Sequence, residues 1–253
     1  MVQQLVGMLR NLSADEPRLL HIDEAGVAQV RDLSEDVFAE PLERARAVRD
    51  FFAWPGKRHY EGLWWSSSNH GLVRFESLLE QQAIEWFDFD PSVAAMSSQP
   101  FALLWPRGAQ SQSWHVPDLF LRRLDGSARV VDVRPESRVD ADAVAQFDRT
   151  REACAAVGWD YEVFPGLCEP LALNVRFLGG YRFDRCRPTV VDQNRVLRRL
   201  RPGSSIGDSL DDLAGTTSAS RGTVLVHLYN LLWRQMLHTD LNVPLRMESM
   251  VTA

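Results

Sequence analysis

The stretch WHVPDLF at residues 114–120, followed by VVDVRP at residues 130–135, decides the fold expected of this chain. Both are apolar strand patterns, and each contains one carboxylate, Asp118 in the first and Asp132 in the second. A buried charge without a partner is costly, so each carboxylate needs a partner or a metal ion beside it. We therefore expect the two strands to meet at a site that neutralises both charges.

The residues between the two stretches predict how the strands pair. Residues 122–127 (RRLDGS) place Asp-Gly between apolar alternations, which is a good signal for a short hairpin. The strands should then be antiparallel neighbours, which brings Asp118 close to Asp132. Side chains alternate along a strand, so Arg134 should project from the same face as Asp132. An Asp132–Arg134 ion pair on a solvated face, with Asp118 as a turn residue, explains the same pattern without any chemistry.

The composition is that of a soluble globular protein. With 253 residues, the chain can form one large domain or two small ones, each with an ample core. The net charge of -6 excludes a uniformly basic nucleic-acid binder, although a local basic patch would suffice for phosphate contact. The widely spaced Cys154, Cys168 and Cys186 indicate a reducing cytoplasm, without a disulfide framework or a zinc site. No segment approaches membrane-spanning length, so we expect a cytoplasmic protein that does not contact a membrane.

Helix and strand patterns alternate along the chain in an order typical of an α/β fold. In chain order we expect a hairpin (19–30), an amphipathic helix (34–52), a helix (75–87), a strand broken at Gln99-Pro100 (93–105), the Asp118 and Asp132 strands, a helix (140–157) and a strand (161–164). The central order is therefore helix, three strands, helix, strand.

Glu80 is a third candidate carboxylate. In the helix expected over 75–87, Glu76 falls in the first turn, where the helix dipole and water account for it. Glu80 lies beside Leu79 and Ala83, on or near the apolar face. Glu80 is therefore the better candidate for a site residue.

Several ordered motifs across about residues 74–181 resemble the TnsA-type endonuclease subunit of heteromeric transposases, within the PD-(D/E)XK nuclease superfamily. The motifs are RFESLLE (74–80), FDPSV (89–93), QPF (99–101), HVPD (115–118) and VDVRP (131–135). The resemblance implies an α/β fold with a restriction-endonuclease-like mixed-sheet core. Its expected parts are an N-terminal extension (1–65), a nuclease domain (66–185) and a winged-helix-like C-terminal domain (186–253).

The same resemblance implies a metal-dependent DNA endonuclease. Such a subunit cuts double-stranded DNA at transposon or element ends, with an integrase-type transposase and an ATPase regulator as partners. By motif position, Glu80, Asp118 and Asp132 would hold Mg²⁺ or Mn²⁺, and Arg134 stands where the family has its catalytic lysine. Arginine pairs well with phosphate but does not easily release a proton. The alternative is therefore a catalytically weak or inactive DNA-binding or scaffold subunit that keeps the nuclease fold.

Basic residues outside these motifs are candidates for DNA contact. Residues 182–201 contain seven arginines and only two aspartates, so a track along DNA phosphates and a solvated linker are both open. Residues 205–251 predict two helices and then a β-wing over 241–251, as in a winged helix that binds DNA or a protein partner. The candidates for DNA contact are Lys57, Arg58, Arg195, Arg198, Arg199, Arg201 and Arg221.

Overall fold

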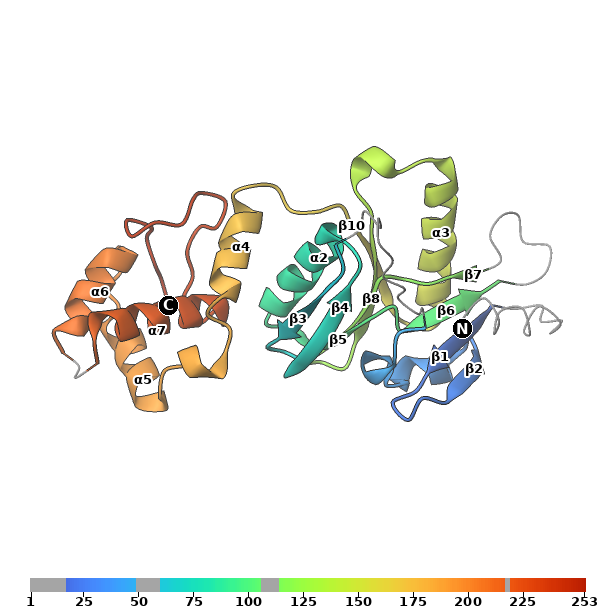
Figure 1. The fold of residues 1–253 in the computed structure, drawn as a ribbon, viewed down its shortest axis with the longest axis horizontal. Helices are drawn as coiled ribbons and strands as arrows, with labels where there is room; N and C mark the ends of the chain where they lie inside the picture. The colour runs from blue at the N-terminus through green and yellow to red at the C-terminus, as the bar shows by residue number, and fades with distance from the viewer. Residues whose placement is uncertain (1–16, 49–59, 106–113, 217–218) are drawn as a thin grey trace. The chain divides into compact units, whose positions relative to one another are not determined.

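The computed structural model describes residues 17–48, 60–105, 114–216 and 219–253 (Figure 1). Contacts divide the chain into two compact units. The first unit comprises Met1–Ile84 and Ser92–Gly166, and the second comprises Glu85–Pro91 and Leu167–Ala253. The division falls before the 185/186 boundary expected from the sequence, and the N-terminal extension belongs to the first unit.

The central sheet of the first unit has the strand order β10-β9-β8-β5. Strands β5, β8 and β9 are antiparallel neighbours, whereas β10 pairs parallel with β9. Parallel neighbours need a crossover connection, and α3 provides it (Figure 1). The chain order is α2 (Leu78–Phe89), β5 (Val93–Ser98), β8 (Leu119–Arg123), β9 (Ala128–Val133), α3 (Ala141–Ala156) and β10 (Asp160–Phe164). The α/β arrangement predicted from the sequence is therefore confirmed.

The turn between β8 and β9 is the hairpin that the Asp-Gly pair predicts. Leu119 lies opposite Val131 in an antiparallel register. Asp125 accepts a hydrogen bond from the backbone N–H of Ser127 at 2.9 Å, and Gly126 has a φ of 85°, which favours glycine. This prediction is confirmed.

A second sheet of the first unit has the order β2-β1-β6-β7. Its strands are β1 (Arg18–Ile22), β2 (Ala28–Asp32), β6 (Phe101–Leu104) and β7 (Trp114–His115), and β3 (Gly62–Ser66) pairs separately with β4 (Gly71–Phe75). The β1–β2 hairpin confirms the prediction over 19–30. The single broken strand expected over 93–105 is wrong, because the chain leaves one sheet at Ser98 and enters the other at Phe101. Gln99, with a φ of 49°, makes the turn.

The amphipathic helix expected over 34–52 is also wrong where the structure describes it. Residues Glu35–Ala39 and Leu42–Arg44 form separate 3-10 turns. Pro41 lies between them, and proline provides no N–H to continue a helical hydrogen-bond ladder. The apolar residues Val37 and Leu42 are still buried in the core, so the hydrophobic pattern reports burial without reporting a helix.

An aromatic cluster fills the core between the central sheet and α3. Phe120 is fully buried, and its ring centroid lies 5.3 Å from that of Trp159 and 6.3 Å from that of Phe101. Val130 of β9 belongs to the same core cluster. Because side chains alternate along a strand, Asp132 shares this face of β9 with Val130. The apolar core therefore fixes the face from which Asp132 projects.

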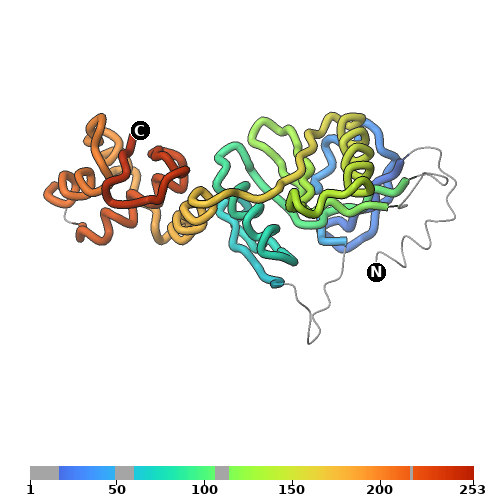
Figure 2. Tube along the Cα trace, turned by 90° about the horizontal axis from the view of Figure 1, so that it is seen from above, coloured from blue at the N-terminus to red at the C-terminus, as the bar shows by residue number. Residues whose placement is uncertain are grey.

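In its described residues, the second unit contains four further α-helices. They are α4 (Leu171–Gly179), α5 (Val190–Arg199), α6 (Ile206–Ala214) and α7 (Arg221–Trp233), and the last three lie in the orange to red part of Figure 2. Thr189, Ser205 and Ser220 cap the N-termini of α5, α6 and α7.

The β-wing expected over 241–251 is not formed. Residues 234–253 contain isolated bridges, such as Ser205 with Met250, but no strand. Buried Asn174 of α4 takes the place of a partner strand: its amide nitrogen donates to the carbonyls of Leu241 and Val243, and its oxygen accepts from the N–H of Leu245. The turn and apolar pattern of this stretch therefore belongs to a loop, which is held by the Asn174 side chain and by backbone hydrogen bonds such as that from the N–H of Ile206 to the carbonyl of Ser249.

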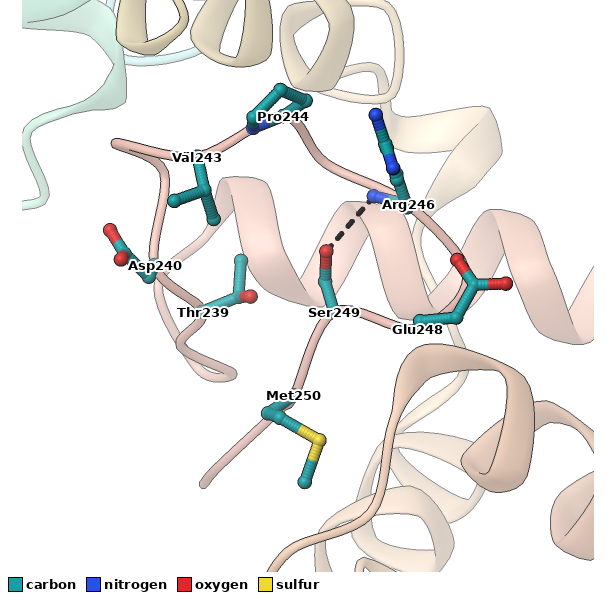
Figure 3. Close-up of a pocket in the computed structure, with 8 residues that line it drawn as sticks. All are labelled: Thr239, Asp240, Val243, Pro244, Arg246, Glu248, Ser249 and Met250. Carbon is teal, nitrogen blue, oxygen red and sulfur yellow. Dashed lines mark hydrogen bonds between the residues drawn. The ribbon is translucent and has the colours of Figure 1, made fainter.

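This C-terminal loop lines a cavity of about 460 Å³ that is open to solvent (Figure 3). Val243, Pro244 and Met250 supply apolar lining, and the N–H of Arg246 donates to Ser249 Oγ at 2.9 Å. Asp240 and Glu248 are drawn on opposite sides of the cavity in Figure 3, so its carboxylates do not converge. In the described part of the chain, every helix is too short or too polar to cross a bilayer.

Candidate functional site

Asp132 is the centre of a buried polar network. Its side chain on β9 has a relative exposure of 5%. His115 Nε2 lies 2.9 Å from each carboxylate oxygen, and the Tyr161 hydroxyl donates to Oδ2 at 2.5 Å. Gln146 Nε2 lies 2.8 Å from His115 Nδ1. We call these four side chains, from β7, β9, α3 and β10, the Asp132 network.

The hydrogen-bond pattern assigns donors and acceptors within this network. An amide nitrogen of Gln146 is a donor, so Nδ1 of His115 accepts and Nε2 carries the proton offered to Asp132. Burial first, and then the charge of Asp132, raise the pKa of Tyr161, so its hydroxyl stays protonated and donates. The buried charge expected from the sequence is therefore held by hydrogen-bond donors.

Cys154 lies close to the network but is not a nucleophile. Burial, with a smaller effect from the charge of Asp132, raises the pKa of its thiol to about 12. The thiolate is the reactive form of cysteine, and almost none is present at neutral pH. Cys154 acts as a small apolar residue in the core.

Asp118 lies at the start of β8, beside the end of β9. Its N–H donates to the carbonyl of Val131, and its Oδ2 accepts from the N–H of Val133 at 2.7 Å. Leu119 is opposite Val131, so Asp118 is level with Asp132 in the sheet. The structure thus places the two aspartates on neighbouring chain segments, with one Asp118 oxygen bound to the β9 backbone.

Glu80 caps the helix on which it lies. Its Oε2 accepts from the N–H of Glu76 at 2.8 Å, and its Oε1 accepts from the Ser77 hydroxyl at 3.0 Å. Ser77 Oγ, just before the helix, in turn accepts from the N–H of Glu80, as the side chain of an N-cap residue does. Helix α2 begins at Leu78, so Glu80 is in the first turn and Glu76 lies before the helix. The sequence argument that preferred Glu80 because Glu76 occupied the first turn was wrong.

A substitution at Glu80 tests this capping role. Glu80→Ala is expected to lower the free energy of unfolding by about 1 kcal/mol, because it leaves the N–H of Glu76 and the hydroxyl of Ser77 without their acceptor. Glu80→Gln keeps an acceptor oxygen and should cost clearly less. Urea unfolding of both variants measures the difference, and equal losses would contradict the capping role.

Arg134 follows Val133, the last residue of β9. Its side chain is exposed, and its Nε donates to the carbonyl of Arg138 at 2.9 Å. No ion pair joins it to Asp132, although both residues are described. The solvated Asp132–Arg134 pair considered from the sequence is therefore not formed.

The residues expected to hold a metal ion are not grouped as one three-carboxylate cluster. In the described ranges, no three His, Cys, Asp or Glu side chains are arranged so that they could hold an ion. Asp118 and Asp132 have the hard oxygen donors that Mg²⁺ and Mn²⁺ prefer, and they lie on adjacent segments. Both oxygens of Glu80 accept hydrogen bonds at the start of α2. The two aspartates have donor chemistry that fits such an ion, although both oxygens of Asp132 also accept hydrogen bonds, from His115 and Tyr161.

Sequence reasoning did not identify His115, Gln146 or Tyr161 as site residues. Two of them left a signal in the sequence. His115 immediately precedes the Val-Pro-Asp of the HVPD motif. Gln146 is a polar residue adjacent to Phe147, on the side of α3 that is otherwise buried. Tyr161 gave none, because a tyrosine in a buried strand is common.

The predicted DNA-contact residues differ in their surroundings. Lys57 and Arg58 lie outside the described residues. Arg198 and Arg199 are exposed in the last turn of α5, where positive charge suits the helix dipole. The other three form ion pairs: Arg195 with Asp192, Arg201 with Asp212 and Arg221 with Asp211.

No protein-family model matches the chain, and a search of curated proteins finds no significant match. The functional argument therefore rests on the residues and their geometry.

Proposed function

We propose that the chain is a metal-dependent DNA endonuclease of the TnsA type with a PD-(D/E)XK core. The observation that supports this is the connectivity of the first unit. The central sheet takes, in chain order, a helix, a strand, two further antiparallel strands, a crossover helix and a strand parallel to the third, with β6 and β7 of the second sheet inserted after the first strand. Asp132 lies on β9, and Asp118 lies immediately before β8 and level with Asp132. This order and these positions are what the motif resemblance implies for that superfamily.

Asp118 and Asp132 are the residues that would hold Mg²⁺ or Mn²⁺ in this proposal. When bound, such an ion supplies an activated water and neutralises charge on the phosphate. The Asp132 network holds the Asp132 carboxylate in place. Arg134 follows the last residue of β9, on which Asp132 lies. In this proposal its guanidinium would bind a phosphate oxygen in place of the carbonyl of Arg138.

The expected result is nicking of supercoiled plasmid in Mn²⁺, with the partner transposase present, that Asp118→Ala reduces to background. Isothermal titration calorimetry should show Mn²⁺ binding to the wild type that this variant loses, because a hard oxygen donor has been removed. Asp148→Ala is the matched control: it removes an exposed carboxylate of α3 that is paired with Arg151. If the plasmid stays intact and no Mn²⁺ binding depends on Asp118, the endonuclease proposal is wrong.

The alternative is a DNA-binding or scaffold subunit that keeps the nuclease fold. It is favoured by the positions of Glu80, which caps α2, and of Arg134, which is turned to Arg138. Arg134→Lys separates the two functions in the same plasmid assay. A sluggish nuclease should become faster when lysine returns, whereas a scaffold should remain inert.

Under either proposal the ligand is double-stranded DNA, with an integrase-type transposase and an ATPase regulator as protein partners. The second unit would then provide DNA contact through its helices α5, α6 and α7, without the wing that a winged-helix domain has. Helix α5, which lies in the arginine-rich stretch 182–201 and is capped by Thr189, supports this assignment.

A further inference from the structure

Gln146 is a polar residue on the buried face of α3. Ala143 lies one turn before it and Thr150 one turn after it, and both are buried. A long polar side chain in such surroundings loses hydrogen bonds to water unless the fold supplies a partner. That partner is His115: the amide nitrogen of Gln146 lies 2.8 Å from Nδ1 of the ring and 3.5 Å from Nε2. Gln146 therefore binds the Nδ1 side of the ring.

The other ring nitrogen of His115 faces a carboxylate. Nε2 lies 2.9 Å from both Oδ1 and Oδ2 of Asp132, and the side chain of His115 is only 11% exposed. Ionised carboxylate oxygens only accept hydrogen bonds, so Nε2 carries the hydrogen and Nδ1 is the acceptor of the ring. The amide of Gln146 is the donor that this acceptor needs. Asp132 and Gln146 thus hold opposite sides of one ring.

The donors on Asp132 engage its two oxygens unequally. The hydrogen on His115 Nε2 is shared between Oδ1 and Oδ2, whereas the Tyr161 hydroxyl donates to Oδ2 at 2.5 Å. Each carboxylate oxygen has about two acceptor sites. These two donors therefore engage both sites of Oδ2 and leave one site of Oδ1. Oδ1 is the oxygen of Asp132 that suits a hard cation such as Mg²⁺ or Mn²⁺.

We propose that Gln146 is a positioning residue for this cation site. By holding Nδ1, it keeps the His115 ring centred between the two oxygens of Asp132, which orients the carboxylate and leaves the second acceptor site of Oδ1 for the ion. Groups that orient a metal ligand through hydrogen bonds typically change metal affinity by about 10- to 100-fold when they are removed. The inference rests on the proposed function in that it takes Asp132 as a ligand.

The first measurement uses the metal-free protein and needs no DNA. With isotope-labelled histidine, side-chain NMR spectra distinguish a ring with its hydrogen on Nε2 from one with its hydrogen on Nδ1, and the His115 signals are those missing from His115→Gln. We expect the Nε2 form alone in the wild type. Gln146→Met keeps the size of the side chain but removes the donor, so its His115 signals should be broadened or split by exchange. A hydrogen on Nδ1 in the wild type would overturn the proposal.

The second measurement is the Kd for Mn²⁺ of the full chain, by isothermal titration calorimetry. Gln146→Met should raise this Kd by about 10-fold or more. Gln146→Asn should do the same, because its amide is one methylene short of Nδ1. Phe147→Leu is the matched control: it removes packing at a buried neighbour in α3 but leaves the Gln146 side chain in place. Its Kd for Mn²⁺ should equal that of the wild type.

The outcomes separate this inference from the endonuclease proposal. If the wild type binds Mn²⁺ through Asp118 and both Gln146 variants bind it equally well, or if Phe147→Leu loses as much affinity as they do, the role of Gln146 is wrong and the endonuclease proposal stands. A wild type that binds no Mn²⁺ overturns both. If neither Gln146 variant folds, the wild-type spectrum decides by the position of the hydrogen on His115.

Discussion

Replacing Asp132 with alanine is expected to lower the free energy of unfolding by about 3 to 5 kcal/mol, as for the loss of one partner from a buried charged pair. The side chains of Asp132 and His115 are only 5% and 11% exposed. The change leaves His115 Nε2 and the Tyr161 hydroxyl as buried donors without their acceptor.

Asp132→Asn is the matched control for this prediction. An asparagine of the same shape keeps an acceptor for Tyr161 and should retain most of the stability, whereas Tyr161→Phe removes a single hydrogen bond at about 1 kcal/mol. Urea unfolding followed by circular dichroism measures all three variants. If alanine costs no more than asparagine, the network does not hold the fold, and loss of nuclease activity in Asp132→Ala could then be interpreted directly.

The second large effect is expected at Phe120. Phe120→Ala should cost about 3 to 5 kcal/mol, because it removes a fully buried ring and leaves a cavity that rigid neighbours cannot fill. Those neighbours are Trp159, at a centroid distance of 5.3 Å, and Phe101, at 6.3 Å.

Leu124→Ala, in the turn that follows β8, is the control. Leu124 is 75% exposed and its truncation should change stability by no more than about 0.5 kcal/mol. Thermal unfolding monitored by tryptophan fluorescence is suitable, since Trp159 reports on the cavity. Similar melting temperatures for the two variants would contradict the assignment of Phe120 to the core.

The parts of the fold that the sequence predicted are those in which local chemistry and burial agree. The β8–β9 hairpin has an Asp-Gly turn between apolar strands, and α3 has a capping aspartate, Asp140, before a periodic apolar face. The predictions were wrong where the same spacing of apolar residues is compatible with two different structures. Apolar spacing around Val37 and Leu42 fits a helix, yet the same residues are buried from 3-10 turns on either side of Pro41.

The sequence predicted only the part of the candidate site that the pairing of β8 with β9 places. Asp118 and Asp132 are placed by a register that the turn sets. His115, Gln146 and Tyr161 come from three other elements, and no local pattern states that these elements meet at Asp132. The role of Glu80 depended on where α2 begins. Sequence patterns locate a helix start only to within a few residues, so they could not predict which glutamate lies in the first turn.

The side chains of the Asp132 network come from four different elements, and this bears on when their contacts form during folding. His115 and Tyr161 are far apart in the chain, and they meet at Asp132 only after α3 has crossed the sheet and β10 has paired with β9. Contacts that require such closure form late in folding, after the β8–β9 hairpin and its apolar face. Interactions that are absent from the folding transition state act on the unfolding rate. We therefore expect substitutions in the Asp132 network to raise the unfolding rate more than they lower the folding rate.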